Sequence, residues 1–144
     1  SSAASDVYKR QHMYGSTDEG GSFYVKTDTA NIDSDSIFHA GDLNWWHWLG
    51  DTPENNADAK RMAWREFKEL DGLSVDVAMF PVDNRLEDAM EWGAIEFLRR
   101  VQVKKAFIPM HLNGPLWTPS VYFKALFGDV PVWEPQKDGD ECTF

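Results

Sequence analysis

The sequence has almost no cysteine and no long apolar segment. Cys142 is the only cysteine among 144 residues, so no disulfide can form within the chain. A single cysteine is typical of a reducing compartment, and we therefore expect a cytoplasmic location. No apolar run has the length of a transmembrane helix, and there is no signal-peptide pattern. The sequence thus predicts no membrane-embedded segment.

Positive charge is also scarce. The chain has 14 Lys and Arg residues against 24 Asp and Glu residues, which gives a net charge of −10 with histidine neutral. An acidic chain is repelled by nucleic-acid phosphates and by anionic membrane surfaces, so we expect neither as a partner. Hydrophobic residues make up 42% of the chain and aromatic residues 14%. This composition is typical of one packed globular domain.

The first eleven residues, SSAASDVYKRQ, match one reading frame of a transposase adapter used in sequencing libraries. We interpret residues 1–11 as a translated adapter scar and predict that they are disordered and make no essential packing contacts. A genuine polar tail is the alternative and would also be disordered. The predicted domain covers residues 12–135, and residues 136–144 form an acidic tail. A scar at this position implies that an upstream half of the natural protein is missing.

The rest of the chain alternates between strand-like and helix-like segments. Strands are predicted at residues 22–26, 37–40, 75–81, 104–110 and 130–133. Helices are predicted from the loop at 51–56 to Gly72, from Asp83 to Val101, and over 120–127. This alternation indicates an α/β fold with a largely parallel sheet, in which the first two strands are antiparallel.

Two of these strands end in side chains that can bind metal. The apolar run from Ile37 to Ala40 stops at Gly41-Asp42, and the run from Ala106 to Met110 stops at His111. Taken alone, Asp42 is better explained as a residue that caps a turn. The second strand end changes this interpretation, because carboxylate and imidazole groups are ligands for zinc, manganese or iron.

The segments FHAGDLNWW (residues 38–46) and AFIPMH (residues 106–111) resemble the two late metal-binding motifs of the metallo-β-lactamase superfamily. The likeness is closest to its lactonase-like and phosphodiesterase-like hydrolases, and it extends over roughly residues 15–135. The resemblance implies the C-terminal half of an αββα sandwich. It also implies that Asp42 and His111 are metal ligands in a centre with two zinc ions, or alternatively with manganese or iron.

The early His-x-His-x-Asp-His motif of that superfamily is absent from these 144 residues. The resemblance therefore implies a fragment of a metal-dependent hydrolase that uses a metal-activated water on a small-molecule substrate. We expect the fragment to be inactive, or nearly so, without the missing N-terminal half of the same domain. Lactones, phosphodiesters and thioesters all remain open as substrates. The alternative is a non-catalytic α/β binding or interaction domain that uses the surface of Trp45–Trp48.

Residues near the two strand ends are the candidates for substrate contact. Trp45 and His47 lie on the predicted lip of the site, where substrate contact and packing are equally supported. Asn44, like Asn113, is a candidate hydrogen-bond donor to a substrate oxyanion, with a role in the turn as the alternative. No catalytic residue is assigned.

Three further residues have a structural role as the preferred interpretation. His39 is expected to be a core histidine or one that hydrogen-bonds to a metal ligand, and Asp83 a helix cap more than a residue at the edge of the site. His12 is a weak candidate for a metal ligand. Finally, we expect the side chains of Asp42 and His111 to approach each other closely enough to share an ion, and we expect one apolar face of the domain to be exposed.

Overall fold

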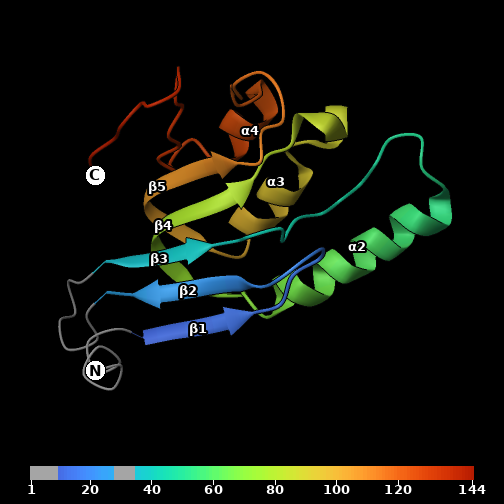
Figure 1. The fold of residues 1–144 in the computed structure, drawn as a ribbon, viewed down its shortest axis with the longest axis horizontal. Helices are drawn as coiled ribbons and strands as arrows, with labels where there is room; N and C mark the ends of the chain where they lie inside the picture. Colours follow the sequence, from blue (N-terminus) through green and yellow to red (C-terminus); the bar gives the residue numbers. More distant parts are fainter. Residues whose placement is uncertain (1–9, 28–34) are drawn as a thin grey trace.

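A computed structural model of the chain describes residues 10–27 and 35–144. It confirms the α/β fold, with one five-stranded mixed sheet in the order β1-β2-β3-β4-β5 (Figure 1). The first three strands are antiparallel, and β3, β4 and β5 are parallel. The elements are β1 (Arg10–Tyr14), β2 (Ser22–Lys26), β3 (Ser36–His39), α2 (Pro53–Lys68), β4 (Ser74–Pro81), the 3-10 helix η1 (Asn84–Ala89), α3 (Trp92–Leu98), β5 (Gln102–Met110) and α4 (Val121–Leu126).

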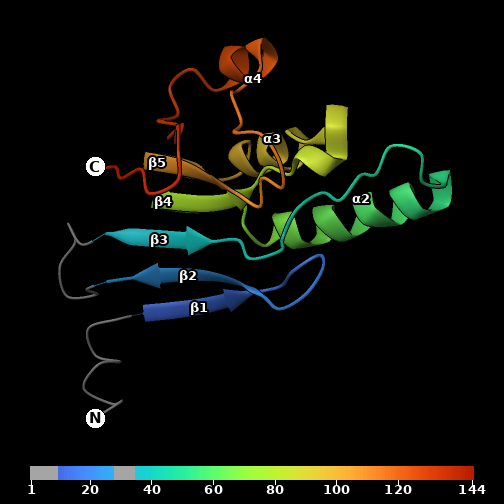
Figure 2. The same cartoon turned by 45° about the horizontal axis from the view of Figure 1, so that its top comes forward.

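The helices α2 and α3 cover one face of the sheet (Figures 1 and 2). The core between them is aromatic: Phe38 on β3 and Phe80 on β4 stack on Phe97 of α3, with ring centroids 5.4 and 4.6 Å apart, respectively. All three rings are fully buried. Burial of a large aromatic side chain contributes roughly 2–3 kcal/mol, so these contacts fix α3 on the sheet.

Local sequence signals define the N-terminus of α2. Thr52 caps its N-terminus, because the side-chain oxygen of Thr52 accepts a hydrogen bond from the backbone N of Asn55 at 3.1 Å. Pro53 follows in the first turn, where its missing N–H has no consequence. Ala63 and Phe67 are the residues that α2 buries against the sheet.

The opposite face of the sheet carries a second set of apolar side chains. The strand register places Val25, Ile37, Val77 and Ala106 in one row. A parallel row contains Phe23, His39, Met79 and Ile108. Both α2 and α3 lie on the other side of the sheet. In these two rows Val77 and Ala106 are buried, whereas Phe23, Val25, Ile37, Met79 and Ile108 are only partly buried. We call these two rows the open face.

The sheet begins two residues before the predicted start of the domain. Strand β1 begins at Arg10, and Arg10 and Gln11 pair with Lys26 and Val25. The prediction of disorder was therefore wrong for these two residues, because their backbone groups pair with strand β2. Residues 1–9 lie outside the described part of the chain.

The helix predicted from Asp83 to Val101 is also wrong. It is divided into η1 and α3, and Glu87 has φ 54° and ψ −123°, a conformation incompatible with a right-handed helix. The strand predicted at 130–133 is reduced to a single bridge between Phe107 and Val132. Residues 136–144 contain no helix or strand, and no helix in the described ranges is long and apolar enough to cross a membrane.

Candidate functional site

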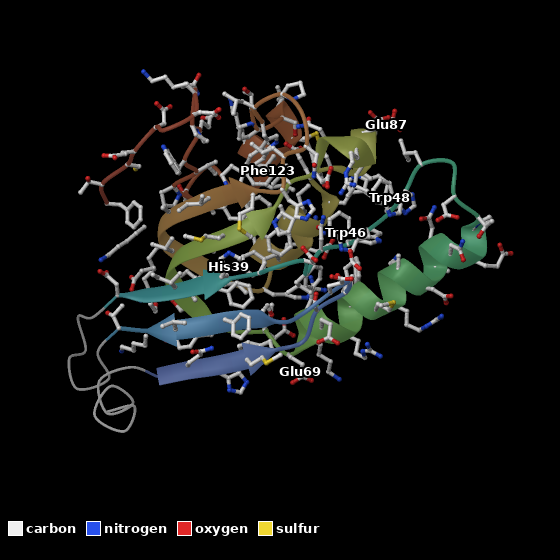
Figure 3. The ribbon with its side chains drawn as sticks, viewed as in Figure 1. His39, Trp46, Trp48, Glu69, Glu87 and Phe123 are labelled. Atoms are coloured by element: carbon white, nitrogen blue, oxygen red, sulfur yellow. The ribbon has the colours of Figure 1, made fainter. Side chains whose placement is uncertain are left out.

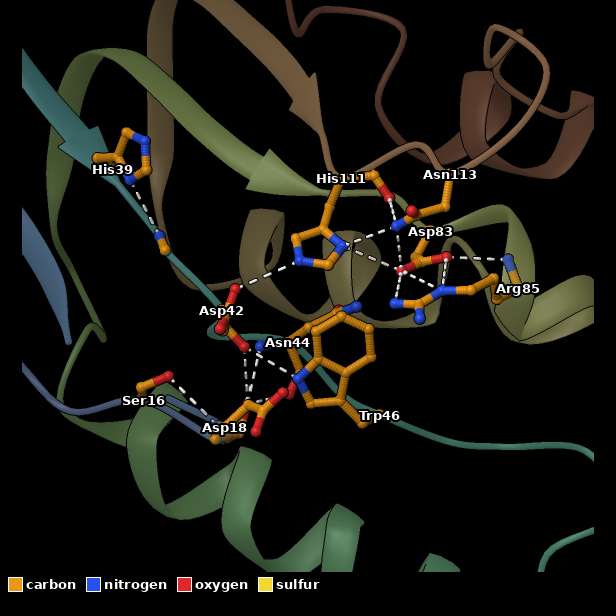
Figure 4. Close-up of polar contacts among 12 residues, drawn as sticks. Ser16, Asp18, His39, Asp42, Asn44, Trp46, Asp83, Arg85, His111 and Asn113 are labelled. Atoms are coloured by element: carbon orange, nitrogen blue, oxygen red, sulfur yellow. Dashed lines mark hydrogen bonds and ion pairs between the residues drawn. The ribbon is translucent and has the colours of Figure 1, made fainter. Parts of the chain in front are cut away.

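Three neighbouring parallel strands end in polar side chains at the same edge of the sheet. Asp42 follows β3, Asp83 follows β4, and His111 follows β5 (Figure 4). Backbone pairing continues just beyond the strands, with Ala40 N donating to Met79 O and Val82 N to Met110 O, both at 2.9 Å. Because the strands are parallel and in register, their carboxyl ends bring these three side chains together.

Asp42 and His111 approach each other closely. The distance from His111 Nε2 to Asp42 Oδ1 is 3.3 Å, and the two side chains are 32% and 34% exposed, respectively. The predicted proximity of these residues is thus confirmed, and both remain accessible to a ligand from solvent. Their role as metal ligands stays a prediction.

Asp83 holds the other side of the His111 ring. Its Oδ2 lies 3.1 Å from His111 Nδ1, and its carboxylate accepts hydrogen bonds from Arg85 Nη2 at 2.7 Å and Arg85 Nε at 3.0 Å. Complete burial raises the pKa of Asp83, but the hydrogen bonds from Arg85 and His111 outweigh burial and hold its pKa below the ordinary value. Asp83 is therefore an anion, which accepts hydrogen bonds only, so Nδ1 of His111 carries the hydrogen.

The predicted cap role of Asp83 is correct but incomplete. Its Oδ1 accepts a hydrogen bond from the backbone N of Arg85 at 2.9 Å, which caps η1. The same carboxylate also contacts His111, so Asp83 lies at the edge of the site as well as capping η1.

The backbone around His111 has an unusual conformation. His111 and Asn113 have φ values of 62° and 47°, in the left-handed region that non-glycine residues seldom adopt. Asn113 Nδ2 donates to Asp83 Oδ2 and to His111 O, both at 3.1 Å, and Asn84 Nδ2 donates to Leu112 O at 2.8 Å. These side-chain amides hold the turn that aims His111 at Asp42, and such conformations cluster at functional sites.

Among the tryptophans after β3, Trp46 is the one beside the site. Its ring centroid is 5.5 Å from that of His111, and its Nε1 donates to Asp42 O at 2.9 Å. Trp45 and His47, which were the predicted contacts, instead pack on Trp92 with centroid distances of 5.2 and 4.8 Å. For these two residues the structure favours the packing alternative.

Asn44 is fully buried beneath the Trp segment. Its Oδ1 accepts a hydrogen bond from the backbone N of Trp45 at 2.9 Å, and its backbone N bonds to Thr17 Oγ1 at 2.9 Å. These contacts support the turn alternative for Asn44, and its contact with a substrate stays a prediction. Asn113, at the edge of the site, is the asparagine that contacts Asp83 and His111.

The other two histidines lie elsewhere. His39 is exposed and not a core residue, and its Nδ1 accepts a hydrogen bond from the backbone N of Gly41 at 3.0 Å, apart from the other labelled side chains (Figure 4). His12 is exposed on β1, where its ring lies 4.3 Å from that of Tyr14. The structure brings neither histidine to the Asp42–His111 contact.

No family model, curated protein or solved structure matches this chain. The comparisons thus leave the likeness to the superfamily resting on the two sequence motifs.

The donors at the site fit part of a metal shell. Two ligands of a tetrahedral zinc ion, each about 2.1 Å from the metal, are roughly 3.4 Å apart. The 3.3 Å between Asp42 Oδ1 and His111 Nε2 agrees with this spacing. A carboxylate on the second ring nitrogen, as Asp83 provides, is typical of metal-binding histidines. Within residues 10–27 and 35–144, however, no group of three or more His, Cys, Asp or Glu residues is arranged to hold a metal ion.

Proposed function

We propose that this chain carries part of the active centre of a metal-dependent hydrolase, in which Asp42 and His111 bind a divalent cation, zinc in the first instance. The observation that carries this proposal is the contact between Asp42 Oδ1 and His111 Nε2. Because Asp83 holds the hydrogen on Nδ1, the Nε2 atom of His111 is the ring nitrogen that faces a carboxylate oxygen, and it is a hydrogen-bond acceptor whenever it carries no proton. Two such acceptors repel each other unless a proton or a cation lies between them, and a shared metal ion resolves that repulsion.

The neighbouring residues have supporting roles in this proposal. Asp83 orients the imidazole, Arg85 keeps Asp83 ionised and in place, and the Trp46 ring shields one side of His111 from water. A bound divalent cation would supply a water of lowered pKa as the nucleophile. These residues position and shield the site; they do not by themselves attack a substrate.

Two protein ligands are too few for a catalytic zinc ion, which takes three together with a water. We therefore propose that the remaining ligands come from a further part of the same domain, the N-terminal half that the superfamily resemblance implies. The open face of the sheet is the surface that a second sheet of an αββα sandwich would cover. On this proposal the chain alone is inactive, or nearly so.

Zinc titration of the chain by calorimetry tests the proposal. We expect weak binding by the unmodified chain and no measurable binding by Asp42→Ala or His111→Ala. His12→Ala and His39→Ala are matched controls, because both histidines are exposed and away from the site, and they should bind as the unmodified chain does. Circular dichroism establishes whether each variant is folded. Equal zinc binding by all five proteins contradicts the proposal.

The second candidate is a non-catalytic binding domain. It is favoured by the arrangement of Trp46 and Trp48, whose rings are nearly parallel, with an interplanar angle of 11° beside a surface hollow. A folded chain that binds no zinc but binds a small organic ligand would support this alternative.

A further inference from the structure

A hollow of about 440 Å³ lies beside the candidate site. Its walls come from the β1–β2 loop, the Trp segment after β3, the first turns of α2, and Arg85 of η1. Small-molecule sites have volumes of roughly 300–1,000 Å³, so the hollow is large enough for a small organic ligand.

Two tryptophans form the aromatic wall of the hollow. The rings of Trp46 and Trp48 are inclined by only 11°, with centroids 6.1 Å apart, between η1 and α2 (Figure 3). The hydrogen bond from Trp46 Nε1 to Asp42 O and the bond from Trp48 N to Asn56 Oδ1, at 3.1 Å, hold this segment in place. The aromatic faces are thus fixed before any ligand arrives, which lowers the entropic cost of binding.

The remaining wall is acidic. Asp18, Asp51 and Asp58 line the hollow, and the only basic residue in its lining is Arg85. The charge of Arg85 is already compensated by the buried Asp83 carboxylate. Arg61 offsets Asp58 in part from outside the lining, whereas Asp51 takes hydrogen bonds from Asn55 Nδ2 and Thr52 N that lower its pKa and keep it ionised. The lining therefore has a net negative charge.

One cation of the protein itself already lies over an aromatic ring of the hollow. The guanidinium carbon of Arg85 lies 5.4 Å from the centroid of the Trp48 ring. Tryptophan faces attract cations through their negative quadrupole, and quaternary ammonium ligands are recognised in this way. Carboxylates around such faces add attraction for a cation and repel phosphate, sulfonate and carboxylate groups.

From the aromatic wall and the net negative charge of the lining, we infer that this hollow binds an organic cation against the faces of Trp46 and Trp48. The ligand would carry an ammonium or guanidinium group on a small carbon skeleton. The inference does not depend on the proposed metal site. It has a consequence for that site, because Trp46 borders both the hollow and His111. A substrate seated here would carry positive charge, and an anionic phosphodiester would be disfavoured.

Calorimetric titration of the metal-free chain with phenyltrimethylammonium tests the inference. Two comparison ligands carry a similar aromatic ring: benzenesulfonate has a negative charge, and benzyl alcohol is uncharged. We expect the cation to bind at least about tenfold more tightly than either, and its affinity to fall at high salt. Equal or tighter binding of the anion, equal binding of the neutral ring, or no binding of the cation overturns the inference.

Substitutions then locate the binding. Asp18→Asn combined with Asp58→Asn removes two charges with little change of shape, and the cation should bind about fivefold more weakly. Trp48→Leu should weaken binding by at least about fivefold while the backbone bond to Asn56 remains. Asp129→Asn, at an exposed position outside the hollow, is the matched control and should bind like the unmodified chain. Unchanged binding in both site variants, with each confirmed to be folded, places the ligand elsewhere and overturns the assignment.

Discussion

Asp83 and Arg85 form an asymmetric ion pair beside the candidate site. The Asp83 side chain is fully buried, whereas that of Arg85 is 50% exposed. If Asp83 is replaced, Arg85 can turn towards water. If Arg85 is replaced, the carboxylate stays buried and loses its main charge partner. The two substitutions are therefore not equivalent, although they break the same contact.

We predict that Arg85→Met destabilises the protein more than Asp83→Asn does. Asp83→Asn should lower the free energy of unfolding by about 1–2 kcal/mol. The substitution removes charge-assisted hydrogen bonds, but it leaves no unpaired charge in the protein interior. Urea denaturation followed by circular dichroism measures both midpoints. A lower midpoint for Asp83→Asn than for Arg85→Met would contradict this account.

Gly93 permits close contact between α3 and the Trp segment. A Cβ at this position would lie 1.8 Å from Asn44 Oδ1 and 2.9 Å from Trp45 N. Asn44 is fully buried, and its Oδ1 accepts a hydrogen bond from Trp45 N that a displacement of the side chain would break. Glycine is thus required here by packing rather than by its backbone conformation.

We therefore predict that Gly93→Ala lowers the free energy of unfolding by about 2–3 kcal/mol through overpacking. Gly15→Ala is the matched control, since the atoms nearest to its Cβ would be those of the Glu66 carboxylate, the end of a flexible side chain that can rotate away. Thermal denaturation should show a clear loss for the first variant and a small one for the second. Similar losses in both would show that the Asn44 contact is not the cause.

At the level of elements, the sequence predicted those with a strong local pattern. The strands β2 to β5 and the helix α2 were found, because alternating or helical apolar spacing reflects which side is buried. Strand β1 was missed: Gln11, His12 and Met13 are all exposed. An edge strand of this kind is held by backbone pairing, which leaves little trace in side-chain pattern.

The break between η1 and α3 could not be predicted from spacing. Buried Leu86, Ala94 and Phe97 keep helical intervals on both sides of Glu87. The direction of α3 depends instead on distant contacts. Glu91, at its N-terminus, accepts hydrogen bonds from Trp117 Nε1 at 2.8 Å and from Ser120 N at 2.9 Å.

The sequence predicted the residues of the site that directly follow buried strands. Asp42 and His111 were found as side chains that end buried strands, and Asp83 ends the strand between them by the same rule. By contrast, the sequence could not predict which tryptophan side chain lies beside His111. The turn after β3 places Trp46 at the site and turns Trp45 into the core, and residue type alone does not distinguish the two.

A pair of residues fixes the register between β3 and β4. Ser36 N and Ser36 Oγ donate to Asp76 Oδ2 at 2.8 and 3.2 Å, and Asp76 N donates back to Ser36 Oγ at 3.1 Å. Partial burial raises the pKa of Asp76, but the bonds from Ser36 and the charges of Lys105 and Lys104 outweigh it, so the pKa is lowered overall. A lowered pKa in the folded state means that the carboxylate stabilises the fold when ionised.

We predict an acid-dependent loss of stability that Asp76→Asn reduces. The contribution of Asp76 is fully present above the pKa of the unfolded chain, about 3.9, and is lost as pH falls through the lower folded-state value. Urea denaturation between neutral and acidic pH should show Asp76→Asn less stable near neutrality, with a smaller further loss in acid. Asp129→Asn should retain the pH profile of the unmodified chain. Parallel profiles for all three proteins would exclude this role for Asp76.

At the scale of the molecule, the unusual feature is the open face, an apolar sheet face on which neither α2 nor α3 packs. Partly buried Phe23, Val25, Ile37, Met79 and Ile108 lie on it, opposite the helices. An apolar sheet face of this kind is normally covered by another layer. Without such a layer, copies of the chain can reduce their exposed apolar surface by packing on each other.

We predict concentration-dependent self-association through this face, and that Met79→Lys suppresses it. Lysine at position 79 of β4 would place a charge in any such interface. Val121→Lys is the matched control, because Val121 is 87% exposed on α4 and lies off the open face. Sedimentation velocity and binding of a hydrophobic dye measure the effect. A monodisperse monomer that binds no dye would exclude the interface.

The order of strands in the sheet also bears on how the chain folds. Each strand pairs with the strand that precedes it, so no strand has to enter between two that already pair. The β1–β2–β3 meander closes through short connections, and β4 and β5 then add at the same edge after their helical crossovers. Pairings close in sequence form faster than distant ones. Each ladder can therefore form between strands that are consecutive in the sequence, without displacing a pairing that already exists.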